Sequence, residues 1–329
     1  MTPAELAARL RGGDLTAAPA VLNLVETTTP EARAASAELL AALAPRELGR
    51  EAPGHIIGIT GPPGVGKSTL LSRLGAELRG RGRSVAILAV DPSSKRSGGS
   101  LLGDRARIDY DPADRGLFIR STAAGERLGG LAPATRAAAG ALAVAFDVVV
   151  IETVGVGQSE TEVSDVADTV VVVIQPGSGD VLQFLKAGIM ETPDVLVVTK
   201  ADLGRVAQRA MADLHASLRS IGARDTRVIG VSSVAPVQGI DSLVEALDVH
   251  RAGLDLAARR VQARRAHALD DFVEECGARG LRALGGRRRA QRWLEDQDPD
   301  LEVPALLRGL EARAADPVPA PTPAPAPAS

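Results

Sequence analysis

The chain has 329 residues, a formal net charge of −3, 45% hydrophobic residues and only 2% aromatic residues. That length suits one large α/β domain with appendages, and the core must be built from Val, Leu, Ile and Ala. The charge balance gives no electrostatic support for nucleic-acid binding. A single cysteine, Cys276, excludes an intramolecular disulfide and indicates a reducing compartment. Because the sequence shows neither an apolar run of roughly 18 residues nor a signal pattern, we expect no membrane association and a cytoplasmic protein.

Residues 1–50 are predicted to form a helical extension. Thr2 to Glu5 has capping-box spacing with Pro at the first helical position, and Thr29-Pro30-Glu31 starts another helix that runs towards Leu43. The extension is either a packing appendage or a surface for a partner.

The first chemical motif is a glycine-rich loop of the form G-x-x-x-x-G-K-(S/T) between a predicted strand and a predicted helix. Such a loop wraps a phosphate chain with backbone N–H groups, and the helix N-terminus adds positive charge. Lys67 is expected to reach the β- and γ-phosphates, and the Ser68 hydroxyl to bind Mg²⁺. An ordinary Gly/Pro turn is the alternative, which the full spacing and context disfavour. The nucleotide-binding loop comprises Gly61, Pro62, Pro63, Gly64, Val65, Gly66, Lys67, Ser68 and Thr69.

Strand and helix signals alternate through residues 51–238, which we assign to a phosphate-loop nucleotide-binding domain. Several predicted strands, such as Val148 to Ile151, are β-branched runs without alternation, as expected for strands buried on both faces. This pattern predicts an α/β fold with a mainly parallel sheet covered by helices. The predicted strands span residues 55–60, 85–90, 117–120, 147–152, 169–174, 194–199 and 227–232.

Three acidic residues are candidates for the region around the metal. Asp91 follows the second strand in A-V-D-P-S-S, where a carboxylate can hold a metal-bound or attacking water; a turn at a strand end is the alternative. Asp104 ends the glycine-rich stretch G-G-S-L-L-G-D-R, which suits either a mobile switch or a plain surface loop. Glu152 ends an apolar strand, and Gly155 after it can offer its N–H to a γ-phosphate.

A guanine-reading motif follows the strand at residues 194–199. The order Thr199-Lys200-Ala201-Asp202 has the form (N/T)-K-x-D, in which the aspartate accepts two hydrogen bonds that guanine donates and adenine does not. The Lys200 stem is expected to cover the base or brace the phosphate loop. Backbone N–H groups after the next strand are placed to meet the guanine oxygen. These belong to Ser232, Ser233 and Val234, and together the motifs favour GTP over ATP.

Residues 239–315 are predicted to be helical and residues 316–329 to be a disordered Pro/Ala tail. A seam at heptad-like spacing suggests either a helix packed on its own domain or a dimerisation arm, and the pattern alone does not choose. The seam consists of Leu243, Leu247, His250, Leu254, Ala257 and Val261.

Taken in order, these motifs resemble those of the MeaB/ArgK-type GTPases. The matching stretches are G-P-P-G-V-G-K-S-T, A-V-D-P-S-S, G-G-S-L-L-G-D-R, E-T-V-G-V-G-Q-S-E, P-G-S-G-D-V-L-Q-F-L-K-A-G-I-M-E and T-K-A-D, all within residues 54–235. The resemblance implies a GTP-hydrolysing chaperone for an adenosylcobalamin-dependent acyl-CoA mutase, typically methylmalonyl-CoA mutase. It also implies a homodimer formed through the C-terminal helical region, which favours the dimerisation-arm interpretation of the seam.

Site roles carry over from this resemblance residue by residue. Asp180, Gln183 and Lys186 lie in a segment that looks like an additional switch, where Lys186 and Asp180 would act in catalysis; an exposed helix face is the alternative for Gln183 and Lys186. GTP and GDP would be substrate and product, with Mg²⁺ as the metal and no permanently bound cofactor. Catalysis would rest on Lys67, Glu152, Asp91, Lys186 and Asp180, and metal binding on Ser68, Asp91, Asp104 and Glu152.

Two departures from the family pattern limit this transfer. Thr199 stands where the guanine motif often has Asn, which bears on loop stability more than on base choice. The segment Ser121 to Gly130 lacks the Arg-Gly pair expected before Leu-Gly-Gly.

Three other functions compete with the chaperone. A kinase of a small molecule or transport protein needs an acceptor domain that is not evident, and a nickel-handling GTPase should show more than four His and one Cys. A non-catalytic interaction protein would not need these motifs intact.

Overall fold

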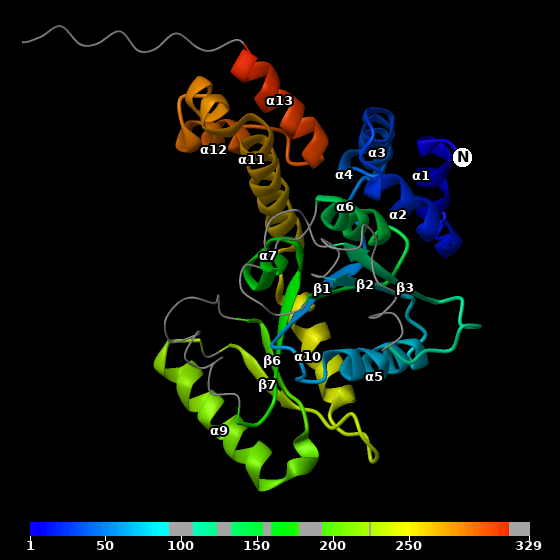
Figure 1. Ribbon diagram of the computed structural model, residues 1–329, viewed down its shortest axis with the longest axis vertical. Coiled ribbons are helices and arrows are strands. Elements are labelled where there is room, and N and C mark those ends of the chain that lie inside the picture. The colour runs from blue at the N-terminus through cyan, green and yellow to red at the C-terminus, as the bar shows by residue number, and fades with distance from the viewer. Residues whose placement is uncertain (92–107, 124–132, 154–158, 178–192, 224, 316–329) are drawn as a thin grey trace, which may run out of the picture.

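A seven-stranded sheet in which every neighbouring pair of strands is parallel organises the molecule (Figure 1). The computed structural model describes residues 1–91, 108–123, 133–153, 159–177, 193–223 and 225–315. The strand order is β3-β2-β4-β1-β5-β6-β7. The strands are β1 (His55–Thr60), β2 (Val85–Asp91), β3 (Leu117–Ala123), β4 (Val148–Thr153), β5 (Thr169–Ile174), β6 (Val195–Val198) and β7 (Arg227–Gly230). All seven predicted strands are therefore confirmed, with β3 longer than predicted and both β6 and β7 shorter.

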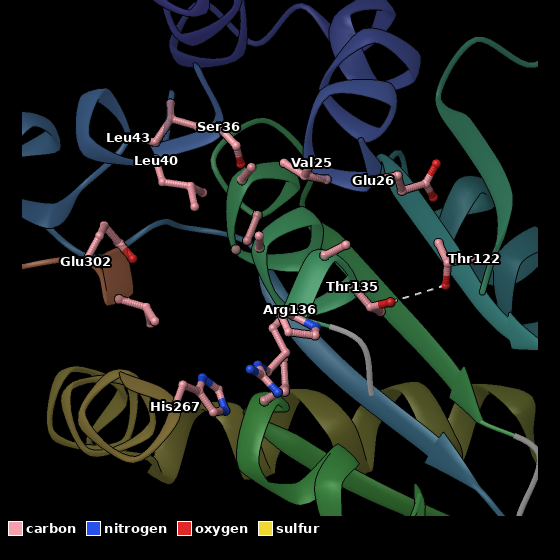
Figure 2. A pocket seen from close by; sticks show the side chains of 18 of the residues that line it. Val25, Glu26, Ser36, Leu40, Leu43, Thr122, Thr135, Arg136, His267 and Glu302 are labelled. Atoms are coloured by element: carbon pink, nitrogen blue, oxygen red, sulfur yellow. Dashed lines mark hydrogen bonds between the residues drawn. The ribbon is translucent and has the colours of Figure 1, made fainter. Parts of the chain in front are cut away.

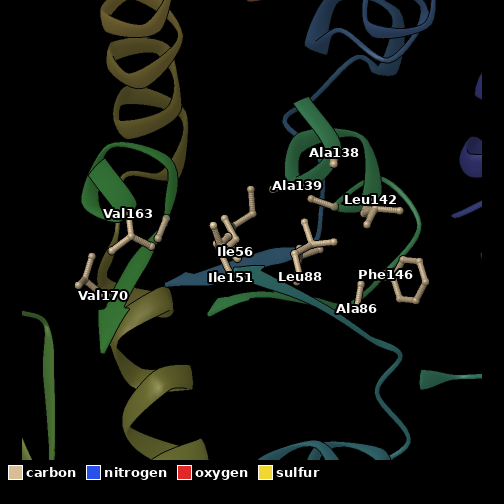
Figure 3. Close-up of a cluster of buried hydrophobic side chains, with 14 of the residues drawn as sticks. Ile56, Ala86, Leu88, Ala138, Ala139, Leu142, Phe146, Ile151, Val163 and Val170 are labelled. Carbon is tan, nitrogen blue, oxygen red and sulfur yellow. The ribbon is translucent and has the colours of Figure 1, made fainter. Parts of the chain in front are cut away.

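Helices cover both faces of the sheet, which explains the β-branched strands. In β4, Val149 and Ile151 belong to the apolar cluster that includes residues of α6, α7 and α9, part of which Figure 3 shows around Ile151. Val148 and Val150 belong to a second cluster, which includes residues of α5 and α10. Successive side chains of a strand point to opposite faces, so both faces must be apolar. The covering helices are α5 (Lys67–Gly80), α6 (Pro133–Leu142), α7 (Ser159–Val166), α9 (Arg205–Ser220) and α10 (Ile240–Gly253).

The N-terminal extension is helical, as predicted, and has a small core of its own. The capping box is present: the Thr2 hydroxyl accepts from the Glu5 N–H at 3.2 Å, and the Glu5 carboxylate accepts from the Thr2 N–H at 2.8 Å. Leu22 packs into the sheet core near α6, which fixes the extension to the edge of the domain. The extension contains α1 (Pro3–Arg11), a 3₁₀ turn (Leu15–Ala17), α2 (Ala18–Glu26), α3 (Pro30–Ala42) and α4 (Pro45–Leu48).

The C-terminal region is a separate helical cluster that lies next to the extension in Figure 1. Its core gathers apolar side chains such as Phe272, Leu294 and Leu310. The helices are α11 (Leu256–Ala283), α12 (Arg287–Glu295) and α13 (Val303–Ala315). No helix in the described part of the chain is long and apolar enough to cross a membrane.

The heptad-like seam is not one continuous helix. α10 ends at Gly253, and Leu254 has an extended backbone with φ −83° and ψ 138°. Leu243 and Leu247 are buried in the sheet core, so the first part of the seam packs on its own domain. The seam therefore spans two helices, α10 and α11, and its first part fits the alternative of a helix packed on its own domain.

A buried arginine attaches α11 to the sheet at the edge where β1 begins. The Arg260 guanidinium contacts both Asp168 carboxylate oxygens, at 2.9 and 2.6 Å, and donates to the carbonyls of Ala52 and Gly54 at 2.6 and 2.7 Å. Asp168 is 1% exposed and also accepts from the Ile56 N–H at 2.8 Å. This network joins the C-terminal helices to the start of the strand that leads into the phosphate loop.

Candidate nucleotide-binding site

The predicted phosphate loop connects β1 to α5, and its shape depends on glycine. Gly61 has φ 146°, and a Cβ there would lie 2.1 Å from the Val173 carbonyl oxygen of β5. Gly64 and Gly66 have φ values of 77° and 96°, a region that L side chains rarely adopt. The loop therefore passes close to β5 and then turns directly into the helix.

The N-terminus of α5 is built to receive an anion. Gly66 is its N-cap and makes no side-chain capping bond, so the first N–H groups of the helix face the loop without a cap. Lys67 is 7% exposed, and its ammonium donates to the carbonyls of Gly61 and Pro62 at 2.6 and 3.2 Å. These contacts hold the ammonium group of Lys67 against the backbone of the phosphate loop, where the motif predicts a positive charge.

An acid lies beside the loop, on the strand next to β1. Glu152 ends the apolar run of β4, is 6% exposed and is in register with Ile59 of β1 and Ala89 of β2. Its Oε1 lies 3.5 Å from the Ser68 hydroxyl oxygen. The structure therefore brings together two of the four predicted metal ligands.

Asp91 is the last residue of β2, as the sequence suggested. Val90 is in register with Thr153, so the ends of β2 and β4 reach the same edge of the sheet. The position of the Asp91 side chain lies outside the described part. So do four further predicted residues, namely Asp104, Gly155, Asp180 and Lys186, and Gln183 beside them.

Thr199 attaches the guanine motif to the phosphate loop. Its hydroxyl is 2.7 Å from the Val65 carbonyl oxygen and 3.0 Å from the Ile174 carbonyl oxygen, and the residue is 4% exposed. One hydroxyl thus joins the ends of β5 and β6 to the loop before α5. A hydroxyl has one proton to share between these two acceptors.

The rest of the guanine motif lies at the surface after β6. Lys200 has φ 55°, and its ammonium donates to the Gln175 side-chain oxygen at 2.5 Å. Asp202 is exposed in a 3₁₀ turn (Ala201–Leu203), which leaves its carboxylate accessible to a ligand. The Ala201 N–H donates to the Val231 carbonyl at 3.1 Å, which ties this turn to the segment after β7.

The Ser232 N–H, one of three predicted to meet the guanine oxygen, is engaged within the chain. That N–H donates to the Gln238 carbonyl at 3.0 Å, and the Ser232 hydroxyl donates to the Val234 carbonyl at 3.1 Å. The backbone folds back on itself here and uses the donor internally. Ser233 and Val234 remain the candidates for this contact.

The comparisons decide the family. A model of the family described as methylmalonyl Co-A mutase-associated GTPase MeaB matches residues 18–280. The chain belongs to this family. It is 42% identical over 253 residues to a Mycobacterium tuberculosis protein named "Probable GTPase", and the match covers 75% of this chain and 74% of that one.

Two further matches agree with this MeaB-family assignment. The "Methylmalonic aciduria type A homolog, mitochondrial" of Caenorhabditis elegans is 40% identical over 223 residues, which cover 66% of this chain and 55% of the worm protein. A crystal structure of a LAO/AO transport system kinase covers 94% of this chain and 96% of its own, with a TM-score of 0.64 and 27% identity. This MeaB-type protein is accordingly a GTPase that binds the nucleotide and hydrolyses GTP.

Two hydroxyl groups of this GTPase that the sequence did not single out lie at the same edge of the sheet. Thr60 directly precedes Gly61 and Thr153 directly follows Glu152; both are buried, and neither Oγ1 has a hydrogen-bond partner. A buried hydroxyl without a partner is unusual and calls for an explanation. Their positions, at the last residues of β1 and β4, are the only signal that the sequence could have offered.

The residues of the site fit Mg²⁺. Ser68 and Glu152 supply hydroxyl and carboxylate oxygens, which are the hard ligands that Mg²⁺ prefers. Mg²⁺ generally binds through one or two carboxylates together with substrate phosphates rather than through an all-protein cage. A pair of protein oxygens beside the phosphate loop matches that requirement.

Proposed function

We propose that this GTPase hydrolyses GTP with Mg²⁺ to assist cofactor loading, protection or reactivation of an adenosylcobalamin-dependent acyl-CoA mutase, with methylmalonyl-CoA mutase as the first candidate. The observation that carries the proposal is the family match over residues 18–280, whose description names association with that mutase. The name of the worm relative, a methylmalonic aciduria type A homolog, supports the same partner, a mutase that acts on methylmalonyl-CoA.

The chain's own residues divide the work at the phosphates. The Lys67 ammonium exchanges its loop carbonyls for phosphate oxygens, and the N–H groups at the start of α5 hold the phosphate chain. Ser68 and Glu152 would hold Mg²⁺, which supplies charge neutralisation when bound. Phosphoryl transfer to water needs positioning and electrostatic stabilisation more than covalent chemistry.

Slow intrinsic turnover is part of this proposal. No arginine is assigned by sequence to the transferring phosphate, and turnover should rise when a partner positions the proposed switch residues Asp104, Asp180, Gln183 and Lys186. Thr199, Lys200 and Asp202 would hold the guanine base, with Ser233 and Val234 beside it.

The quaternary arrangement is also proposed. A homodimer would use the C-terminal helices, and with Leu243 and Leu247 buried in the domain, the part of the seam left for it is Ala257 and Val261 on α11. Sedimentation of the purified chain tests this, and a single monomeric species at micromolar concentration would exclude it.

The experiment that tests the function is GTP hydrolysis by the purified protein with and without an adenosylcobalamin-dependent mutase of the same organism, with ATP as the competing nucleotide. Stimulation of GTP turnover by the mutase is expected. Lys67→Ala should remove turnover in both conditions, whereas Arg81→Ala, at the far end of α5 in an exposed pair with Glu77, should behave as wild type.

The other outcomes separate the alternatives. Guanine-specific turnover that no mutase changes would leave the GTPase and remove the partner. Transfer of the γ-phosphate to an acceptor other than water would favour the kinase, the activity for which the similar LAO/AO transport system kinase is named. Normal GTP hydrolysis by Lys67→Ala would refute the assignment of the phosphate site.

A further inference from the structure

A large cavity separates the N-terminal extension from the C-terminal helices. It has a volume of about 1860 Å³ and is bounded by α2 and α3, by β3 and α6, and by α11 and α13 (Figure 2). Small-molecule sites commonly measure roughly 300–1,000 Å³, so this one has room for a ligand of cofactor size. None of its lining residues belongs to the phosphate loop or the guanine motif, so it is distinct from the nucleotide site.

Buried polar atoms without partners are concentrated at two places. Among the residues that the structure describes, five side-chain atoms are buried with no hydrogen-bond partner. Two are the hydroxyls of Thr60 and Thr153 at the nucleotide site. The other three are Ser121 Oγ, Arg264 Nε and His267 Nε2, and all three residues line the cavity. Because such groups cost free energy unless something satisfies them, the same feature that marks the nucleotide site also marks the cavity.

Two of the arginines that line the cavity have their charge paired with a carboxylate, and what they leave there is a hydrogen-bond donor. Arg136 contacts Asp271, and the two Nη atoms of Arg264 contact Glu51 at 3.0 and 2.7 Å. Arg264 Nε–H can only donate, and the Ser121 hydroxyl can donate its proton. A ligand group that satisfies these atoms must therefore offer oxygen acceptors.

Two titratable side chains face the same space without carrying full charge. His267 is 8% exposed, and burial together with the charge of Arg136 lowers its pKa to about 3, so its ring is neutral and one nitrogen donates. Burial raises the pKa of Glu302 to about 7, so near neutrality a large fraction carries a proton that it can donate. Figure 2 shows both side chains pointing into the cavity, His267 from α11 and Glu302 from the residue before α13.

Apolar side chains also line the cavity. Val25, Leu40 and Leu43 line it from the extension, Ile56 from β1 and Leu307 from α13. Leu40 points from α3 towards α6 in Figure 2. A hydrocarbon chain laid against these side chains would be removed from water, at roughly 25 cal/mol per Å² of apolar surface.

We propose that this cavity is a second ligand site, which binds an amphipathic molecule with a hydrocarbon chain and a head group of carbonyl or carboxylate oxygens. The chain lies against the Leu40 and Leu307 wall, and the head group meets Ser121, Arg264 and His267. This function goes beyond GTP hydrolysis and does not depend on the mutase. Residues of β3 and α6 line the cavity. β3 pairs with β2, the strand that ends in Asp91, so a ligand in the cavity would contact a strand that neighbours the nucleotide site.

Gly140 offers a direct test. It lies in α6 on the cavity wall, and a Cβ built there meets nothing within 4 Å. Gly140→Trp fills the cavity from an open position, while Gly140→Ala adds a single methyl group to the same helix. Titration calorimetry of the full-length protein measures the affinity for octanoate, octanamide and octylamine. The affinity for GTP, measured in the same way, shows whether each variant is folded.

The proposal expects octanoate and octanamide to bind wild type and Gly140→Ala equally, and Gly140→Trp at least tenfold more weakly with GTP affinity unchanged. His267→Phe should weaken octanamide several-fold, since it removes a donor and keeps the ring volume. The proposal is overturned if neither oxygen-bearing probe binds, or if Gly140→Trp binds them as wild type does. Preference for octylamine would overturn the assigned head group.

Discussion

Thr199 offers a sharp test of how the guanine motif supports the phosphate loop. Thr199→Val keeps the shape of the side chain and removes the hydroxyl that contacts Val65 and Ile174. The Ile174 carbonyl still accepts from the Thr199 backbone N–H at 2.8 Å, so the loss falls mainly on the Val65 carbonyl in the phosphate loop. Leaving one buried carbonyl without this donor costs about 1–3 kcal/mol.

That cost sets the expected effect on nucleotide binding. If the whole of it loosens the loop, GDP and GTP should bind about 5- to 150-fold more weakly, since 1.4 kcal/mol corresponds to about a factor of ten. Fluorescent GDP titration measures the affinity, and stopped-flow displacement should place most of the change in the dissociation rate. Thr199→Ser is the matched control, because it keeps the hydroxyl and should stay within about threefold of wild type.

Thr199→Asn extends the test in the other direction. Its amide has two N–H donors for the two carbonyls, so this variant should bind nucleotide at least as tightly as wild type. The reasoning is refuted if Thr199→Val binds GDP like wild type, or if Thr199→Ser loses as much affinity as Thr199→Val. In either case the 2.7 Å contact would have no part in holding the loop.

Three further predictions concern the helical regions. His267→Gln should make the free energy of unfolding less sensitive to acid. In wild type, burial lowers the His267 pKa to about 3, so the unfolded chain takes up the proton before the folded chain does. The free energy of unfolding of wild type should therefore fall by about 3 kcal/mol from pH 6.5 to 4, as urea unfolding at a series of pH values measures. Glu302→Gln should change stability at high pH instead. Burial raises the Glu302 pKa to about 7, so wild type loses stability as pH rises from 4.5 to 7, and the variant should be about 1–3 kcal/mol more stable than wild type at pH 8. Equal stability of the two proteins at pH 8 would contradict the raised pKa. Arg260→Met should cost about 3–5 kcal/mol in urea unfolding because it leaves the Asp168 carboxylate buried without its partner, whereas Arg287→Met, from an exposed pair with Asp270, should cost under about 1 kcal/mol.

Local sequence signals predicted the sheet and the phosphate loop well, because each depends on neighbours in the chain. Runs such as Val170 to Ile174 allow only a strand buried on both faces, and the Gly61 to Thr69 spacing allows only one loop shape between a strand and a helix. Ser68 was predicted from the loop motif and Glu152 from an apolar strand that ends in an acid, and the structure brings the two side chains together because β4 lies next to β1.

Other features depend on contacts that no short stretch contains. The seam from Leu243 to Val261 repeats at heptad spacing, but Leu254 is extended and two different helices carry the repeat. Apolar periodicity records which face is covered and does not record what covers it. The internal bond between Ser232 and Gln238 was hidden for a similar reason, since a tight return of the chain depends on the backbone rather than on side chains.

The unpaired polar atoms of the nucleotide site and of the cavity share one physical cause. At the candidate nucleotide site, the Thr60 and Thr153 hydroxyls are buried without partners, next in sequence to Gly61 of the phosphate loop and to Glu152. A site that exchanges ligands must keep polar groups which the protein alone does not satisfy, and their cost is recovered when the ligand binds. The cavity has the same property, but its polar groups come from β3 and α11, whose neighbouring elements no sequence motif brings together. It exists only because the extension and the C-terminal helices pack around α6, and so no local pattern could predict it.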